Sequence, residues 1–501
     1  MLRRYLFLIP LALLTACNKG DITEIVNTKY GQIEGYVDGD IHIYKGIPFA
    51  KPPLNELRWQ APQAPDNWEG IKSTKNFSAS PMQNEPKPFS CWSEEFIAPP
   101  EPLSEDCLYL NVWTGAAQSN EKRPVFVWIY GGGFNSGSAA CDIYDGAAYA
   151  KEGVVFVSIN YRVGPFGFLA HPGLTEEQGG HSGNYGILDQ IAALQWVKDN
   201  IAAFGGNPDD VTIAGQSAGS MSVHILTASP LAKGLFQKAI AMSGGFSSNR
   251  VPANLPSAEA VGQELQENLG VSTLNEMRAK SAEDILMAGN QLKSGRPGLV
   301  IDNYVLPENA FEKRVNEVPV LTGWTKDDGG FLSGQNLTLE KYIEETREQL
   351  GDKADAYLTV FGASSDEEAQ KMRVKARTLA FAGVPARLLA LNQHQPVFVY
   401  EVAHVPTDKP DFPHYGAFHT SDVPYALGNL HTWNRPWKDH DREVEHTLSS
   451  YYLNFIKTGN PNSQELPDWE PYTKDNGFVE VIDTETQGKE NYYQAEFSVL
   501  N

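Results

Sequence analysis

The pentapeptide Gly215-Gln216-Ser217-Ala218-Gly219 lies between a short apolar segment, 211–214, and a segment of helical character, 220–226. A G-x-S-x-G sequence between a strand and a helix predicts a turn so tight that the serine is strained and its hydroxyl is exposed. A Cβ at either glycine would clash with neighbouring backbone. The N-terminus of the following helix favours negative charge close to the serine. Because five residues also match by chance, the rest of the chain has to support this interpretation.

The chain alternates apolar runs with amphipathic segments. Near-continuous apolar runs are typical of strands covered on both faces, and they occur at 124–130, 154–159, 318–322 and 396–402. Between 187 and 201 apolar residues recur at helical spacing, and Gly205-Gly206 ends that helix. Residues from roughly 258 to 351 predict helices and polar loops. With no internal repeat or long linker, the pattern predicts one large α/β domain with a mostly parallel sheet.

Charge and composition exclude several classes of protein. Of 501 residues, 11% are aromatic, 44 are glycine and 32 are proline, which rules out a disordered chain or a coiled coil. Asp and Glu number 62 against 40 Lys and Arg, a formal net charge of −22. A surface this acidic repels phosphate backbones, so we expect no nucleic-acid partner.

The first sixteen residues have the pattern of an export signal. Met1 to Arg4 is basic, and the apolar run from Tyr5 to Ala16 is shorter than the ~20 residues that span a bilayer. Leu14-Thr15-Ala16-Cys17 resembles the bacterial lipoprotein signal, in which cleavage precedes a cysteine that is lipidated; the alternative is a plain signal peptide with a coincidental cysteine. We therefore expect a signal peptide at 1–16, a lipidated tether at 17–24 and a single domain at 25–501. The protein would be exported and membrane-anchored, on the periplasmic or outer-membrane side of a bacterial cell.

Four cysteines limit the disulfides. They are Cys17, Cys91, Cys107 and Cys141. If Cys17 carries a lipid, the remaining three allow at most one intramolecular disulfide, which an exported compartment permits. The sequence alone leaves three pairings open.

A second glycine cluster, Tyr130-Gly131-Gly132-Gly133-Phe134, directly follows the apolar run at 124–130. Residues without side chains let backbone N–H groups approach a substrate carbonyl and stabilise a tetrahedral oxyanion. The alternatives are a flexible turn or a phosphate loop, but no Lys-Ser/Thr follows and no G-x-G-x-x-G motif occurs. The two glycine turns together therefore favour a serine hydrolase, and we expect neither cofactor nor metal.

Several longer motifs resemble the type-B carboxylesterase/cholinesterase family. They are Gly46–Ala50, Ser104–Val112, Ile129–Phe134, Asn160–Phe168, Gly183–Gln190, Asn200–Pro208, Gly215–Gly219 and Asn454–Asn462. The resemblance covers essentially the whole mature chain. It implies an α/β-hydrolase fold, in which a mostly parallel central sheet is flanked by helices and insertions form an active-site gorge. It also implies hydrolysis of small-molecule carboxylic esters through an acyl-enzyme.

The resemblance assigns roles residue by residue. Ser217 would be the nucleophile, His419 in the motif Gly416–Tyr425 the general base, and Asp328 the acid that orients His419. The implied oxyanion-hole donors are the backbone N–H groups of Gly132, Gly133 and Ala218. The order Ser217, Asp328, His419 is that of α/β-hydrolases. The family usually has Glu at the acid position, so Asp328 has to reach His419 with a side chain shorter by one methylene. The adjacent Asp327 is expected to be structural or exposed.

Other departures from the family pattern bear on the substrate. Gln216 stands where many members have Glu, which removes one negative charge beside the nucleophile. Tyr130 stands where many have His. Phe134, Phe331 and Trp92 are candidates to line an aromatic gorge or to pack in the core.

The resemblance also implies structural pairs and alternatives. It favours a Cys91–Cys107 disulfide, with Cys141 free, and a structural pair between Arg58 and Glu105. The family includes adhesion proteins without catalysis, but these usually lose a triad residue and none is lost here. Amide hydrolysis would use the same residues and stays open.

Overall fold

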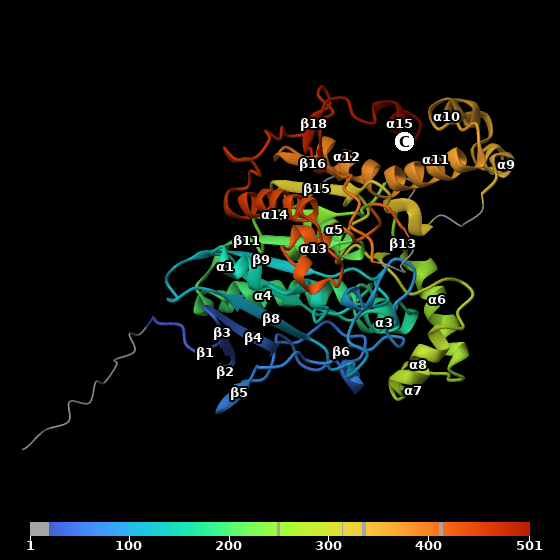
Figure 1. The fold of residues 1–501 in the computed structure, drawn as a ribbon. Helices are drawn as coiled ribbons and strands as arrows, with labels where there is room; N and C mark the ends of the chain where they lie inside the picture. Colours follow the sequence, from blue (N-terminus) through green and yellow to red (C-terminus); the bar gives the residue numbers. More distant parts are fainter. Residues whose placement is uncertain (1–19, 248–250, 313, 333–336, 410–413, 501) are drawn as a thin grey trace, which may run out of the picture.

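The computed structural model describes residues 20–247, 251–312, 314–332, 337–409 and 414–500. At its centre lies an eleven-stranded sheet with the order β18-β17-β16-β15-β12-β11-β9-β10-β8-β4-β3 (Figure 1). Its strands are β3 (Tyr36–Asp38), β4 (Ile41–Pro48), β8 (Tyr109–Thr114), β9 (Arg123–Ile129), β10 (Val155–Ile159), β11 (Gly206–Gln216), β12 (Lys238–Met242), β15 (Val320–Thr325), β16 (Val397–Val402), β17 (Val479–Ile482) and β18 (Gln487–Lys489).

The middle of this sheet is parallel and its edges are antiparallel. Seven neighbouring strands, from β10 through β9, β11, β12, β15 and β16 to β17, run in parallel register. Strand β8 is antiparallel to β10 and β4, and β18 is antiparallel to β17. The expectation of an α/β fold with a mostly parallel sheet is confirmed. The predicted apolar runs correspond to β9, β10, β15 and β16. In β9, for example, the residues from Val125 to Ile129 are wholly buried.

Smaller sheets and helices surround this core. The remaining strands are β1 (Ile25–Asn27), β2 (Gln32–Glu34), β5 (Ile71–Ser73), β6 (Ser80–Pro81), β7 (Leu103–Ser104), β13 (Ala253–Asn254) and β14 (Val300–Ile301). The α-helices are α1 (Ala147–Lys151), α2 (Gly164–Phe168), α3 (Pro172–Glu177), α4 (Tyr185–Asn200), α5 (Ala218–Ala228), α6 (Leu255–Asn268), α7 (Leu274–Arg278), α8 (Ala282–Gly289), α9 (Leu339–Leu350), α10 (Ala354–Val360), α11 (Asp366–Thr378), α12 (Val384–Leu391), α13 (Val423–Ala426), α14 (Asp439–Thr458) and α15 (Gln494–Leu500).

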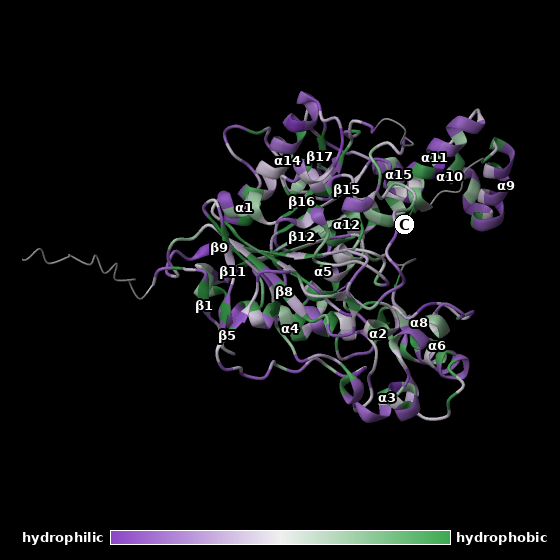
Figure 2. Ribbon diagram, turned by 60° about the horizontal axis from the view of Figure 1, so that its bottom comes forward, coloured by the Kyte–Doolittle hydropathy of each residue, from purple (hydrophilic) through white to green (hydrophobic). Residues whose placement is uncertain are grey.

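Helices cover both faces of the sheet. In Figure 2, strands β9 and β11 lie between α1 and α14 on one side and α4 on the other. Helix α4 ends at Asn200 and continues as a short 3-10 turn to Phe204, after which Gly205 takes a left-handed conformation with φ 79°. Glycine tolerates that conformation without strain, so the predicted helix end at Gly205 has a physical cause.

The predicted N-terminal segments lie only partly within the described residues. The signal sequence 1–16 and Cys17 lie outside them. From Gly20 onward the chain lies on the body of the protein, because Ile22 is buried and its N–H donates to the carbonyl of Ala117 at 2.9 Å. No helix in the described ranges is both long enough and apolar enough to cross a bilayer.

The expected Cys91–Cys107 disulfide is absent, and that expectation is corrected. Cys91, Cys107 and Cys141 are all free and buried. The two expected partners have different charged neighbours. The charges of Asp328 and Arg435 act on the pKa of Cys91, whereas those of Asp189 and Arg162 act on the pKa of Cys107. Burial raises the pKa of all three thiols, so they are held as neutral, poorly reactive groups.

Candidate active site

The turn between β11 and α5 holds Ser217 in a strained conformation. Its φ is 59° and its ψ −120°, a combination that L-residues rarely adopt. A Cβ on Gly215 would lie 2.5 Å from the carbonyl of Gly219, and a Cβ on Gly219 would lie 2.1 Å from Ile129 O. The N–H of Ser217 donates to Met242 O at 2.9 Å. Both glycines of the motif are therefore required by close backbone approach, as the sequence predicts.

The glycine loop after β9 packs against this turn. A Cβ on Gly131 would lie 2.7 Å from Gln216 O, so the two turns are in direct backbone contact. Gly132 and Gly133 have φ of 103° and 62°, values that favour glycine. Gly132, Gly133 and Ala218 line the same cavity as Ser217. The backbone N–H groups assigned to the oxyanion hole are thus brought to one place.

The predicted acid and base are in contact. Asp328 follows β15, and His419 lies in the segment that connects β16 to α13; the two are 91 residues apart in sequence. His419 Nδ1 is hydrogen-bonded to Asp328 Oδ1. Both side chains are buried, Asp328 at 0% and His419 at 4% exposed. The shorter Asp side chain therefore reaches the imidazole in spite of the missing methylene.

Asp327 holds the histidine segment in place. Its Oδ2 accepts from Ala417 N at 2.9 Å, and its own N–H donates to Ala417 O at 3.0 Å. Gly416 has φ 66°, and a Cβ there would lie 2.2 Å from Asp327 Oδ2. The structural role expected for Asp327 thus takes a specific form, which is to fix the loop that carries His419. Burial raises the pKa of Asp327.

The other sides of the His419 ring face an amide and three aromatic rings. Gln216 Nε2 lies 3.2 Å from His419 Nε2. Phe331 stacks on the imidazole with ring centres 4.5 Å apart, and Trp92 and Phe381 meet it edge-on at 6.1 and 5.5 Å. Phe331 and Trp92 therefore contact the imidazole as well as lining the cavity.

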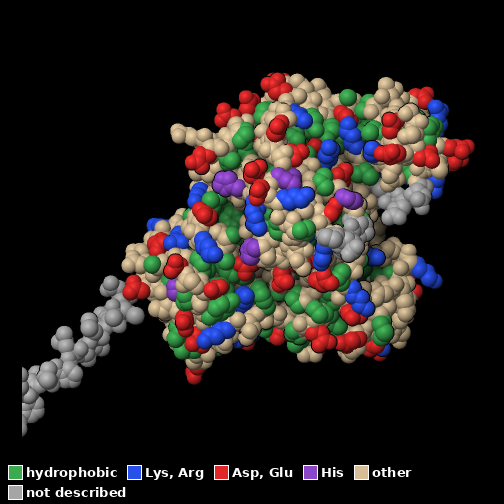
Figure 3. Space-filling model, viewed as in Figure 1, with side chains coloured by type: hydrophobic (Ala, Val, Ile, Leu, Met, Phe, Trp, Pro, Cys, Tyr) green, Lys and Arg blue, Asp and Glu red, His purple; other side chains and the backbone are tan. Residues whose placement is uncertain are grey.

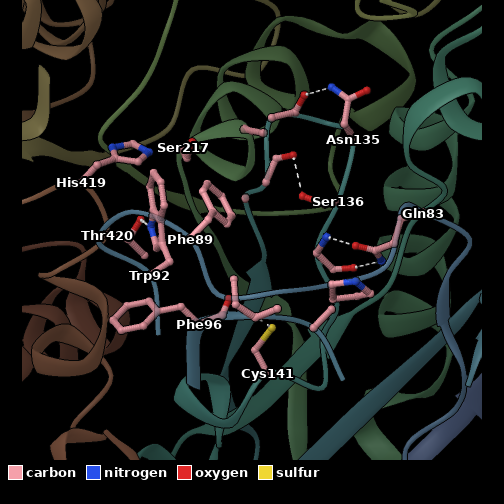
Figure 4. A pocket seen from close by; sticks show the side chains of 18 of the residues that line it. Gln83, Phe89, Trp92, Phe96, Asn135, Ser136, Cys141, Ser217, His419 and Thr420 are labelled. Atoms are coloured by element: carbon pink, nitrogen blue, oxygen red, sulfur yellow. Dashed lines mark hydrogen bonds between the residues drawn. The ribbon is translucent and has the colours of Figure 1, made fainter. Parts of the chain in front are cut away.

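One cavity of about 830 Å³ connects these groups. Since Gln216 contacts His419, Ser217 and His419 lie at the same end of it, with Phe89 and Trp92 close by and Phe96 and Cys141 further along (Figure 4). Aromatic and aliphatic side chains make up much of its wall. A mostly apolar cavity with a few convergent polar groups is typical of a site for a small organic molecule.

The chain is similar to known proteins in sequence and in fold. A sequence profile described as the carboxylesterase family matches residues 22–500. The chain belongs to the carboxylesterase family. It is 35% identical to the para-nitrobenzyl esterase of Bacillus subtilis over 484 residues, 92% of this chain and 95% of that one. It is 36% identical to the fumonisin B1 esterase of Sphingopyxis macrogoltabida over 436 residues, 84% of this chain and 77% of that one.

Solved structures agree with these sequence relatives. A para-nitrobenzyl esterase structure superposes with a TM-score of 0.82 at 30% identity, covering 95% of this chain and 99% of that one. A carboxylesterase of Geobacillus stearothermophilus gives a TM-score of 0.83 at 30% identity, covering 96% of this chain and 100% of that one. The expected α/β-hydrolase fold is therefore confirmed, and the protein is a carboxylesterase-type enzyme.

A second buried acid, Asp422, lies close to Asp328 in this carboxylesterase. Asp422 is fully buried, and both its carboxyl oxygens lack a hydrogen-bond partner among the described residues. Burial, and then the negative charge of Asp328, raise the pKa of Asp422 to about 8. Asp328 Oδ2 likewise lacks a partner within the described ranges. Sequence analysis missed Asp422, although it stands within the motif Gly416–Tyr425 that identifies His419.

The charged residues of the other motifs are structural. Arg58 pairs with Glu105, as expected, and also donates to Arg278 O at 2.8 Å. Arg162 and Asp189, from two neighbouring motifs, form a buried ion pair at 2.7 Å.

One group of residues has the composition of a metal site. Donor atoms of His404, His440 and Asp441 lie within 4.8 Å of one another. Asp441 already accepts hydrogen bonds from His404, Thr407, Tyr425 and Lys438. None of the three lines the cavity that contains Ser217.

Proposed function

We propose that this carboxylesterase cleaves small-molecule carboxylic esters through an acyl-enzyme formed on Ser217, with His419 as general base and Asp328 as its partner. The observation that carries the proposal is the convergence of the strained Ser217 turn, the glycine loop and the His419–Asp328 hydrogen bond on one cavity. Nucleophile, base, orienting acid and oxyanion donors are the parts that acyl transfer requires.

The reaction follows from these positions. His419 accepts the Ser217 proton while Oγ attacks the carbonyl carbon, and Asp328 stabilises the resulting imidazolium. The carbonyl oxygen becomes an oxyanion, which accepts from the N–H groups of Gly132, Gly133 and Ala218. His419 then protonates the leaving alcohol, and the acyl group remains on Ser217. Water, deprotonated by His419, attacks the acyl carbon; the bond to Ser217 Oγ breaks, Oγ takes the proton back from His419, and the carboxylic acid is released.

A series of 4-nitrophenyl esters of increasing acyl length tests this proposal. The wild type is expected to hydrolyse them, and Ser217→Ala to lower turnover by on the order of 10⁶-fold, since loss of a comparable triad serine has that effect. Ser220→Ala is a matched control, because Ser220 lies one turn along α5 and donates to Gly244 O. Full activity of Ser217→Ala would contradict the assignment. A wild type without turnover on any ester would favour a binding protein instead.

We also propose that the protein is exported and held on a membrane by a lipid on Cys17. The support is the sequence Leu14-Thr15-Ala16-Cys17 after a basic start and a short apolar run. Intact-mass analysis of protein from its native membrane should find an acylated chain that begins at Cys17. Cys17→Ser should release the protein from membranes, and a variant that still partitions fully with them would contradict the anchor.

A further inference from the structure

The charged side chains on the wall of the Ser217 cavity do not balance. Apart from His419, the charged residues that line it are Glu85, Lys87 and Arg296. Glu85 and Lys87 neutralise each other in an ion pair at 2.7 Å. Arg296 has no ion pair, hydrogen bond or aromatic contact with any described residue. The described wall therefore carries one uncompensated positive charge, although the whole chain has a net charge of −22.

Among the described residues, the wall offers no unpaired negative charge to a cationic substrate. Gln216, beside the nucleophile, is neutral, and Asp328 is enclosed behind His419 at 0% exposure. Distant acidic residues act weakly on the cavity, because salt screens exposed charges beyond about 8 Å. Acidic and basic side chains are also interspersed on the face shown in Figure 3. The charges on the cavity wall therefore act on a bound substrate more strongly than the net charge of the whole chain.

The loop that carries Arg296 is anchored on both sides. Before it, the N–H groups of Lys293 and Ser294 donate to the carboxylate of Glu264 in α6, at 2.8 and 3.0 Å. After it, Pro297 is buried and leads into β14. A proline also restricts the backbone of the residue before it. Arg296 is thus presented to the cavity from a defined backbone position.

We propose that Arg296 determines specificity for esters that carry a carboxylate at the end remote from the scissile bond. A guanidinium presents paired N–H donors that match the two oxygens of a carboxylate. The apolar side chains of the cavity wall, which include Phe89 and Trp92, suit the hydrocarbon chain between the two ends of such a substrate. This inference rests on the proposed function of Ser217 and specifies its substrate class.

Two matched series of esters test it. The first comprises mono-4-nitrophenyl esters of adipic, pimelic and suberic acid, and the second the neutral 4-nitrophenyl hexanoate, heptanoate and octanoate. The measured quantity is the ratio of kcat/KM between each anionic ester and its neutral counterpart. Arg296→Gln is expected to lower this ratio by about fivefold for the chain length that best spans the site, the effect of one exposed ion pair. Added salt should lower the ratio in the wild type and leave it unchanged in Arg296→Gln.

The double variant Glu85→Gln/Lys87→Gln is the control, because it removes the paired charges and keeps the net charge of the wall. Its ratio should equal that of the wild type. An unchanged ratio in Arg296→Gln at every length, or an equal fall in the control, would overturn the role of Arg296. In either of those cases neutral esters are still hydrolysed, whereas a wild type inactive on both series contradicts the proposed function itself.

Discussion

The protein contains two buried His–Asp pairs that differ in how fully the carboxylate is hydrogen-bonded. His419 contacts Asp328 beside Ser217, and His404 contacts Asp441 between the end of β16 and the start of α14. Both aspartates are wholly buried. By composition and burial alone either pair could serve a nucleophile.

Both oxygens of the Asp441 carboxylate accept hydrogen bonds. Its Oδ1 accepts from His404 Nε2 and Tyr425 Oη, both at 2.9 Å, and its Oδ2 accepts from Lys438 N at 3.0 Å. Thr407 donates to both oxygens. Although burial opposes it, these hydrogen bonds hold the pKa of Asp441 well below its usual value. This pair ties together β16, α13 and α14.

The pair at the cavity keeps groups available for chemistry. Asp328 uses Oδ1 for His419, while its Oδ2 has no partner in the described part of the chain. The second ring nitrogen of His419 lies on the cavity side, beside Gln216, whereas the second nitrogen of His404 faces another carboxylate, Asp483, at 3.7 Å. The comparison teaches that the two pairs differ in the carboxylate: both oxygens of Asp441 are hydrogen-bonded, whereas Asp328 keeps one oxygen without a partner in the described part of the chain.

The largest difference between the two pairs is expected in kcat when the aspartate of each pair is replaced by asparagine. Asp328→Asn removes the charge that orients and stabilises His419, and should lower kcat by ~10⁴-fold. Asp441→Asn should keep kcat per folded molecule within about threefold of the wild type, because His404 does not line the cavity. Steady-state hydrolysis of a neutral 4-nitrophenyl ester measures both. Asp327→Asn is the adjacent control, and a greater loss of kcat there than at Asp328 would show that the acid is wrongly assigned.

For the free energy of unfolding, the larger effect is expected from the substitution of Asp441. Asp441→Asn breaks a buried, fully hydrogen-bonded pair and should lower the free energy of unfolding by about 3–5 kcal/mol. Because the pKa of Asp441 is lowered in the folded state, its contribution is present above pH ~4 and is lost as the pH falls below that value. Thermal unfolding of wild type and variant at pH 6 and pH 3 checks this. If the difference in melting temperature between wild type and Asp441→Asn is as large at pH 3 as at pH 6, the role of the charged carboxylate is contradicted.

Asp422, on the catalytic side, should show the reverse pH dependence. Its folded pKa is raised to about 8, so the folded state retains a proton that the unfolded state loses near pH 4. The stability of the wild type is therefore expected to fall as the pH rises from ~4 to ~8. Asp422→Asn removes this loss, so the stability of the variant relative to the wild type should be greater at pH 9 than at pH 5 by ~4 kcal/mol. If the melting temperatures of wild type and Asp422→Asn change equally with pH between pH 5 and pH 9, Asp422 is not protonated in the folded protein.

The smallest effect concerns Gln216, which precedes Ser217 in the chain and contacts His419. A carboxylate there would favour a cationic leaving group by less than the ~3 kcal/mol expected at ~6 Å without water screening. We expect the wild type to hydrolyse neutral, short-to-medium acyl esters better than choline-like esters, and Gln216→Glu to shift the preference toward the cation by up to about tenfold. The measurement is kcat/KM for a choline ester and its uncharged isostere. A tenfold preference for the cation in the wild type would show that other residues select charge.

The sequence predicted parts of the site that depend on local backbone. Gly215 is required by a contact with Gly219 inside the same turn, and Gly219 by the close approach of Ile129 at the end of β9, so the spacing of the two glycines was informative. The central strands were predicted because they are long and apolar, whereas short strands such as β17 and the edge strand β18 carry too little pattern. Asp328 and His419 came from the family resemblance alone, since their contact joins residues 91 positions apart.

Contacts between loops could not be predicted in this way. Asp422 becomes distinctive only when burial places it near Asp328, and Asp327 only when Gly416 packs against it. The Cys91–Cys107 disulfide was expected from resemblance, and all three described cysteines are free thiols. Pairings that depend on distant segments need the three-dimensional arrangement.

The most direct test of the assignment is the rate at which a fluorophosphonate labels the protein, followed by peptide mapping. In the wild type the label should be found on Ser217. His419→Ala should slow labelling by ~10⁴-fold or more, because no base activates the serine, and folded His404→Ala should be labelled at close to the wild-type rate. Label on another serine, or a greater loss of rate in His404→Ala than in His419→Ala, would contradict the account.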